Sequence, residues 1–158
     1  MALSCSSARS LAARAAVVMV VVLGTASCTT SSDSGNAASE PNTVEWKLAV
    51  VDEGGYVQPD DPAVHEFANA LDVLEGRCHQ NTRAQIGDFV VAGQGQLQER
   101  GVSESLLTIL QAMADPATFR DLQKRVDEAV AGGAISGSSS EGDCAAYVTV
   151  YVTKRTYG

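Results

Sequence analysis

Residues 61–100 of this 158-residue chain read DPAVHEFANALDVLEGRCHQNTRAQIGDFVVAGQGQLQER. The stretch opens with a helix-start signal, Asp61-Pro62. An aspartate side chain accepts hydrogen bonds from the free N–H groups of a helix start, and proline suits the first helical position. Apolar residues then recur at spacings of three and four, which is the period of one helix face. The pattern predicts an amphipathic helix with one buried stripe, made of Val64, Phe67, Leu71, Leu74 and Cys78.

The second half of the stretch predicts another helix after a break at Asn81-Thr82. Helical spacing continues beyond the break through Ile86, Phe89/Val90, Gly93 and Leu97. A glycine inside a helix costs up to about 1 kcal/mol relative to alanine. Because Gly93 lies on the apolar face, we interpret it as a point where a neighbouring backbone approaches closely; the alternative is a frayed or kinked segment. Gly101 is predicted to end this helix.

Two further helices follow. Val102-Ser103 is predicted to start the first, with Ser103 as the cap, Glu104 in the first turn, and Leu106, Leu107, Leu110 and Met113 facing inward. Asp115-Pro116 repeats the Asp-Pro start, and Phe119, Leu122 and Val126 form the next stripe. Gly132-Gly133 is expected to end that helix. Residues 132–143 are rich in glycine and serine, which predicts a flexible loop.

Two segments fit more than one secondary structure. Residues 44–51 (VEWKLAVV) alternate apolar and polar positions as a half-buried strand does, and a short amphipathic helix fits equally well. The β-branched residues of 144–153 (CAAYVTVYVT) favour a strand, but Cys144, Tyr147 and Tyr151 also form a helix stripe that Asp143 or Ser140 could cap. We favour a helix there. The predicted fold is mainly α, a small helical bundle with one disulfide; the alternative pairs the two segments as a minor two-stranded element.

The N-terminus resembles an export signal. Arg9 and Arg14 precede an apolar run at 15–23, and small residues follow at 24–27. This is the pattern of a secretory signal peptide covering residues 1–27. The apolar run is too short to cross a hydrocarbon core of roughly 30 Å as a stable helix.

The residue after the small cluster is Cys28, and this arrangement resembles the lipobox of bacterial lipoproteins. The resemblance implies that Cys28 becomes a lipidated N-terminus bearing palmitate, although Thr25 stands where leucine is commonest. The alternative is ordinary cleavage after Ser27 and release of a secreted protein. Residues 28–43 have no apolar periodicity, so we expect a flexible tether with a reach of roughly 20 Å. The domain at 44–158 would then lie at the outer face of the cytoplasmic membrane.

The remaining cysteines are expected to pair. Loss of the leader removes Cys5, and lipidation of Cys28 leaves Cys78 and Cys144. Because an exported chain meets an oxidising environment, a disulfide is the default state of such a pair. It would close a loop of about 67 residues and stabilise the domain by roughly 4 kcal/mol on the chain-entropy argument. The alternative is two free thiols; neither cysteine has CxxC spacing.

The charge argues against nucleic acid as a partner. The whole chain has a net charge of −8, and loss of Arg9 and Arg14 with the leader leaves nine basic residues against nineteen acidic ones. Nucleic-acid binding requires clustered basic residues that neutralise phosphates, and no such cluster is present. A dispersed negative charge instead predicts a soluble, self-repelling surface.

Chemical motifs are scarce. His65 and His79 are fourteen residues apart, which on one continuous helix is about 21 Å, too far to share a metal ion. No GxSxG, HExxH, P-loop or dinucleotide motif occurs. The acidic pairs Asp52-Glu53 and Asp60-Asp61 lack the alternation of an EF-hand loop and fit capping and turns. We therefore predict no catalytic residue, no metal site and no cofactor.

A resemblance extends over about half of the chain. It rests on Gly55-Tyr56-Val57, Asp61-Pro62, Phe67, Leu71, Leu74, Cys78, Ile86-Gly87-Asp88 and the run from Gly101 to Leu107. These residues resemble a group of small exported proteins, many of them predicted lipoproteins of high-GC Gram-positive bacteria, to which no activity is attached. The resemblance implies an envelope location and a helical fold, and it supplies no site residue.

The sequence is compatible with three functions. The first is a non-enzymatic binding or accessory module, held at the membrane by its lipid and contacting an envelope protein. The second is a hydrolase, which would require a pocket converging on His65 or His79. The third is a sensor or inhibitor of an envelope or secreted enzyme, which would require an exposed apolar patch or a rigid loop.

Overall fold

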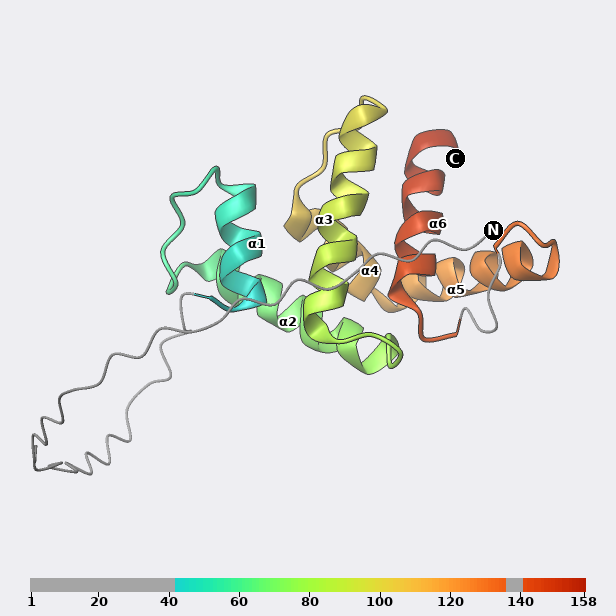
Figure 1. Cartoon of the computed structure of the whole chain (residues 1–158), viewed down its shortest axis with the longest axis horizontal. Helices are drawn as coiled ribbons and strands as arrows, with labels where there is room; N and C mark the ends of the chain where they lie inside the picture. The colour runs from blue at the N-terminus through green and yellow to red at the C-terminus, as the bar shows by residue number, and fades with distance from the viewer. Residues whose placement is uncertain (1–41, 136–140) are drawn as a thin grey trace, which may run out of the picture. The chain divides into compact units, whose positions relative to one another are not determined.

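Six helices are found in residues 42–135 and 141–158, which are the residues described by the computed structural model (Figure 1). No strand occurs among them. The mainly helical class is confirmed, and the two-stranded alternative is wrong, because both segments form helices. The predicted leader, Cys28 and the tether as far as residue 41 lie outside the described residues. The helices are α1 (Val44–Asp52), α2 (Pro62–Arg77), α3 (Arg83–Glu99), α4 (Leu106–Ala114), α5 (Pro116–Ala131) and α6 (Cys144–Tyr157).

The Asp-Pro signals mark the starts of α2 and α5. Asp61 accepts a hydrogen bond from the Ala63 N–H at 2.8 Å, and Asp115 accepts one from the Thr118 N–H at 2.8 Å. The predicted break before α3 is also confirmed. Thr82 caps α3 and exchanges hydrogen bonds with Gln85 in a capping box, which satisfies two N–H groups at once.

The start of α4 differs from the prediction. Its cap is Ser105, whose Oγ accepts a hydrogen bond from the Thr108 N–H at 3.0 Å, and not Ser103. The shift has a tertiary cause, because the carboxylate of Asp52 at the end of α1 accepts a hydrogen bond from the Leu106 N–H at 2.9 Å. Glu104 consequently precedes the helix instead of lying in its first turn.

The two ambiguous segments become helices because α3 offers each of them a close contact. A Cβ atom added at Gly87 would lie 2.6 Å from Val44 Cγ1 on α1. One added at Gly93 would lie 2.6 Å from Val148 Cγ1 on α6. The close neighbour at Gly93 is therefore a valine side chain of α6 and not the backbone that the sequence analysis expected. Asp143 caps α6, accepting a hydrogen bond from the Ala145 N–H at 3.0 Å.

Two helices pack against four others each: α3 against α1, α2, α4 and α6, and α4 against α1, α2, α3 and α5. Among the described residues, no helix has the length and apolar character needed to cross a membrane. Aliphatic side chains dominate the fully buried set, as the low aromatic content requires. Its largest members are Tyr147, Phe67, Leu71, Leu74, Ile86, Leu97, Leu106, Ile109, Leu110, Met113, Leu122 and Val64.

Candidate functional site

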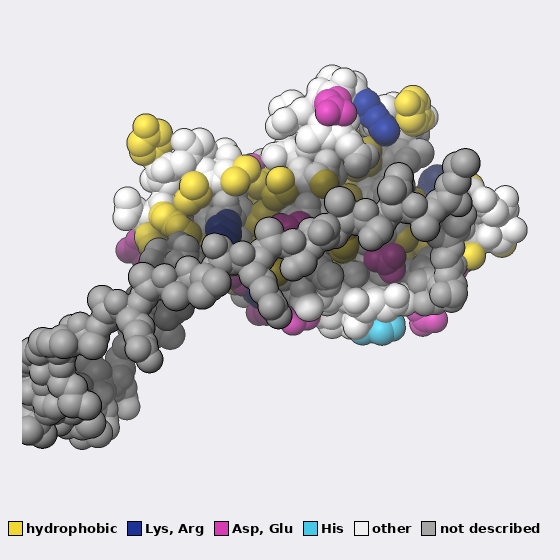
Figure 2. All heavy atoms as spheres, in the orientation of Figure 1, with side chains coloured by type: hydrophobic (Ala, Val, Ile, Leu, Met, Phe, Trp, Pro, Cys, Tyr) yellow, Lys and Arg dark blue, Asp and Glu magenta, His cyan; other side chains and the backbone are white. Residues whose placement is uncertain are grey.

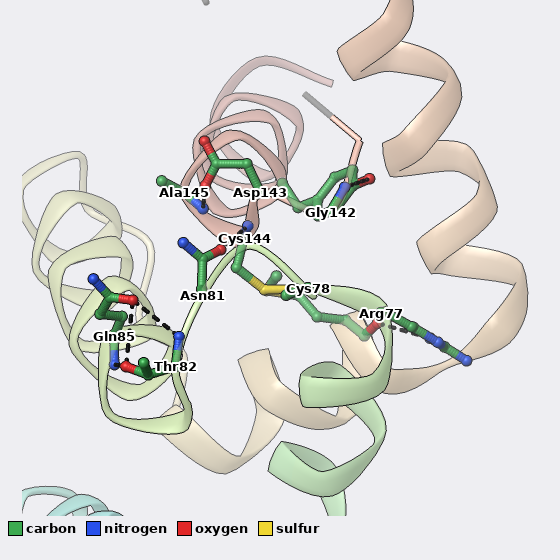
Figure 3. Close-up of a disulfide and its surroundings, with 11 residues drawn as sticks. Arg77, Cys78, Asn81, Thr82, Gln85, Gly142, Asp143, Cys144 and Ala145 are labelled. Atoms are coloured by element: carbon green, nitrogen blue, oxygen red, sulfur yellow. Dashed lines mark hydrogen bonds between the residues drawn. A yellow bond between two sulfur atoms is a disulfide. The ribbon is translucent and has the colours of Figure 1, made fainter. Parts of the chain in front are cut away.

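The two cysteines of the domain form a disulfide, as predicted (Figure 3). Cys78 is the C-terminal cap of α2 and Cys144 is the first residue of α6, with their Cα atoms 5.3 Å apart. Both residues are fully buried. Because thiol–disulfide exchange requires access of a thiolate to a sulfur atom, this buried bond is a structural staple and not a redox site.

Hydrogen bonds reinforce the staple on both sides. The Asn81 side chain accepts from the Cys144 N–H at 2.7 Å, and the Gln80 N–H donates to the Gly142 carbonyl at 3.0 Å. The Gly142 N–H in turn donates to the Tyr147 hydroxyl at 3.2 Å. Burial is the main reason that the pKa of Tyr147 is raised. The turn between α2 and α3 therefore holds the start of α6 in place.

The two histidines are not brought together. Both are exposed, His65 on α2 and His79 just beyond its C-terminal end. The ring of His79 packs against Gly142, which has a φ of 78°. Among the described residues, no group of three histidine, cysteine, aspartate or glutamate side chains is placed to hold a metal ion.

Arg83 forms an ion cluster that sequence reasoning did not find. Its guanidinium forms a salt bridge with Glu45 of α1 and contacts Asp72 of α2 at 2.5 Å. It also donates to the carbonyl of Ala68 at 3.0 Å. The side chain of Glu45 is only 12% exposed, so Arg83 neutralises a nearly buried carboxylate. This cluster fastens α1 to α2 and α3, and its partners are too far apart in sequence for any local pattern to show it.

A second polar cluster surrounds Glu104, whose side chain is 6% exposed. The Tyr151 hydroxyl donates to Glu104 at 2.7 Å, and Arg155 forms a salt bridge with the same carboxylate. Burial and the neighbouring carboxylate raise the pKa of Tyr151 well above its usual value. Since a tyrosine with a raised pKa keeps its proton near neutral pH, Tyr151 is a hydrogen-bond donor here and not a general base.

A hollow of about 280 Å³ adjoins this cluster, lined by Glu104, Thr108, Ala112, Thr118, Tyr151, Lys154 and Arg155. It is slightly smaller than ordinary ligand pockets, which begin at about 300 Å³. Its cations are already paired, because Lys154 donates to Asp121 at 2.8 Å and Arg155 binds Glu104. The hydrogen bond from Lys154, and then that from Arg125, lowers the pKa of Asp121. These ion pairs join α5 and the segment before α4 to α6.

A larger hollow of about 480 Å³ lies between α5 and α6. Its apolar wall is formed by Ala129, Ala134, Ile135 and Val150. Arg125, Lys154 and Tyr157 stand around it, together with Glu128. Neither histidine lines this hollow or the smaller one. The pocket that the hydrolase hypothesis requires is therefore not formed by either hollow.

The loop between α1 and α2 presents the most exposed aromatic side chain. Tyr56 is 89% exposed and Val51, at the end of α1, is 54% exposed. Hydrophobic side chains gather over α1 and the loop that follows it (Figure 2). The backbone around Tyr56 is nevertheless held in place. The Gly55 N–H donates to the Val50 carbonyl at 2.6 Å, and Val57 is 5% exposed.

Glycine makes this loop shape accessible. Gly54 and Gly55 have φ values of 72° and 99°, a region that favours glycine over other residues. On the far side of Tyr56, the Asp61 N–H closes a turn onto the Gln58 carbonyl at 3.0 Å. The signal in the sequence was an aromatic residue directly after Gly54-Gly55. The sequence analysis used Gly55-Tyr56-Val57 only as part of a resemblance.

Comparison of the chain with known protein families, with curated proteins and with solved structures gives no match.

Proposed function

We propose that this protein is an exported, lipid-anchored binding module of the bacterial cell envelope, acting through contact with a protein partner. The leader pattern at 1–27 and Cys28 support export and anchoring. The buried Cys78–Cys144 disulfide supports a domain that folds in an oxidising compartment. Together they favour a domain held on a short tether outside the membrane, where it meets other envelope proteins.

The observation that carries the proposal is Tyr56. A large aromatic side chain at 89% exposure, in a loop with backbone hydrogen bonds on both sides of it, at Gly55 and at Asp61, is what protein interfaces use as an anchor. Its fixed backbone lowers the entropy lost on binding. The exposed side chain of Val51 is close to it in the chain and extends the apolar surface.

A second candidate function follows from the same observation. A sensor or inhibitor of an envelope or secreted enzyme requires an exposed apolar patch or a rigid loop, and the segment from Val51 to Asp61 provides both. An inhibitor is one form of binding module, so this second candidate is a more specific version of the binding-module function proposed above. The hydrolase hypothesis receives less support, because Glu104 and Tyr151 hold each other in a closed hydrogen-bonded cluster.

The test is photocrosslinking of the full-length chain in the cells that produce it. A photoreactive amino acid replaces one exposed residue at a time, at Val51, Val73 or Tyr157, so that separate elements are sampled. We expect a specific protein adduct from at least one position. The adduct should decrease in a Cys28→Ala variant, which loses its anchor. Absence of a protein adduct from all three positions would contradict the proposal, as would substrate hydrolysis that disappears in Glu104→Gln.

A further inference from the structure

We propose that Val51 and Tyr56 form the centre of a docking surface for a basic segment of a partner protein, with Glu53 and Asp60 as its acidic rim. This inference rests on the proposed function and adds the location of the contact and the chemistry of the partner. The surface is made by the end of α1 and the loop that joins it to α2, and we name it the Tyr56 surface.

The apolar centre is unusual for this domain. Tyr56 and Val51 are the two most exposed large hydrophobic residues of α1 and its following loop, at 89% and 54%. The turn between them is closed by the Gly54 and Gly55 N–H groups, which bond back to the carbonyls of Val51 and Val50. A tyrosine offers large contact area with few rotatable bonds, and here its backbone is already fixed. Little conformational entropy is lost when a partner covers it.

The acidic rim, Glu53 and Asp60, favours a positively charged partner. Between residues 44 and 61 Lys47 is the single basic residue, against five acidic ones. Three of the five are engaged: Glu45 binds Arg83, Asp52 caps α4 and Asp61 caps α2. Glu53 and Asp60 are exposed, and neither takes part in a salt bridge within residues 42–135 and 141–158. Their charges remain available to lysine or arginine side chains of a partner.

The wider charge distribution strengthens this selection. Residues 42–114 carry eleven acidic and four basic residues, whereas residues 115–135 and 141–158 together carry six acidic and five basic ones. A basic partner is therefore attracted more strongly to the α1–α4 part of the domain than to the nearly neutral part that contains α5 and α6. Complementary charge of this kind accelerates association and rejects partners of the wrong sign.

The same charges argue for a protein and against a lipid surface as the occupant. An anionic lipid surface would repel the carboxylates of Glu53 and Asp60. The other highly exposed tyrosine, Tyr157, is 78% exposed and has the Arg100 guanidinium 5.8 Å from its ring centre. It provides a control, because it is another highly exposed tyrosine but lies on the basic helix α6.

The experiment uses the full-length anchored chain in its own cells, with the photoreactive amino acid at Val51. The test variants are Tyr56→Ala and the double substitution Glu53→Lys/Asp60→Lys. The controls are Tyr157→Ala and Glu99→Lys/Asp127→Lys, which make the same changes at exposed positions elsewhere. Helical circular dichroism and the absence of free thiols establish that each variant is folded. Mass spectrometry identifies the adduct and the crosslinked peptide.

We expect one protein adduct, crosslinked at a segment rich in lysine and arginine. Its yield should fall about tenfold or more in both test variants, as for loss of an interface hot spot. The controls should stay within about twofold of the unsubstituted chain. The proposal is overturned by an adduct that is insensitive to the test variants, by an adduct at an acidic segment, or by an adduct with lipid or a second copy of the chain.

Failure of this inference is distinguishable from failure of the proposed function. A protein adduct from Val73 or Tyr157 without one from Val51 would support the binding module and refute the Tyr56 surface as the contact site. Absence of an adduct from all three positions removes both.

Discussion

Substitution of Gly93 by alanine should destabilise the domain, although alanine is the better helix former. Gly93 lies inside α3 and is buried against α6. An added Cβ atom would be 2.6 Å from Val148 Cγ1 and 3.5 Å from Val152 Cγ2. The first distance is well inside the contact distance of two carbon atoms, about 3.5 to 4.0 Å, so α3 and α6 must separate or Val148 must leave its rotamer.

The magnitude follows from two opposing terms. An extra methyl group in a packed core costs about 1–3 kcal/mol, and replacing glycine within a helix recovers about 1 kcal/mol. The net loss at Gly93 is therefore up to about 2 kcal/mol. Gly95 lies in the same helix and has no atom within 4 Å of an added Cβ. Gly95→Ala should keep the helix gain alone, a stabilisation of about 1 kcal/mol.

Urea denaturation of residues 29–158 with the disulfide intact measures both variants. The midpoint and the slope are compared, because an unchanged slope shows that stability itself has changed. The two alanine variants should differ by about 1–3 kcal/mol, and Gly93→Ala combined with Val148→Ala should show a favourable coupling. Equal shifts in the same direction at Gly93 and Gly95 would refute the close packing of α3 on α6.

Three other measurements test the remaining contacts. Replacing Cys78 and Cys144 together by serine should lower the free energy of unfolding by about 4 kcal/mol in the same titration, because the bond spans 66 residues. Arg83→Ala should lower it by about 2 kcal/mol, since it leaves the nearly buried carboxylate of Glu45 unpaired; the expected value lies between those for surface and buried pairs. The raised pKa of Tyr151 means that its contribution to stability is complete below about pH 10 and is lost as the pH rises further, so Tyr151→Phe should reduce the alkaline loss of stability.

Two of these measurements have a control variant. Asp72→Asn removes a carboxylate that is 68% exposed, and it should change stability by less than about 1 kcal/mol. A loss as large as that of Arg83→Ala would mean that the Arg83 cluster does not work through Glu45. Tyr157→Phe makes the same substitution at an exposed tyrosine outside the Glu104 cluster and serves as the matched variant for Tyr151→Phe. If the cysteine variants kept full stability, the disulfide would have no role as a staple.

Local signals predicted much of this fold. The starts of α2, α3 and α5 are visible because capping depends on residues within one turn, as at Asp61, Thr82 and Asp115. The cap of α4 was assigned wrongly to Ser103, because both serines precede the same apolar run and only the bond from the Leu106 N–H to Asp52 distinguishes them. That bond joins residues 54 apart, beyond the reach of any sequence window.

The ambiguity of 44–51 and 144–153 had a similar cause. Short apolar runs fit a period of two and a period of 3.6 almost equally well. The helical state is favoured by contacts with Gly87 and Gly93 of α3, which a sequence pattern does not reveal. The Tyr56 surface was missed for a different reason. Exposure of a loop residue depends on which neighbours are buried, and here Val57 turns inward while Tyr56 does not.

The intact mass and thiol content of the protein recovered from cell envelopes decide whether it is an anchored, exported domain closed by one disulfide. We expect a chain that begins at Cys28, carries a lipid increment that disappears in Cys28→Ala, and has no reactive thiol without reduction. A chain that retains residues 1–27 and has Cys78 and Cys144 reactive in the folded state would contradict this expectation.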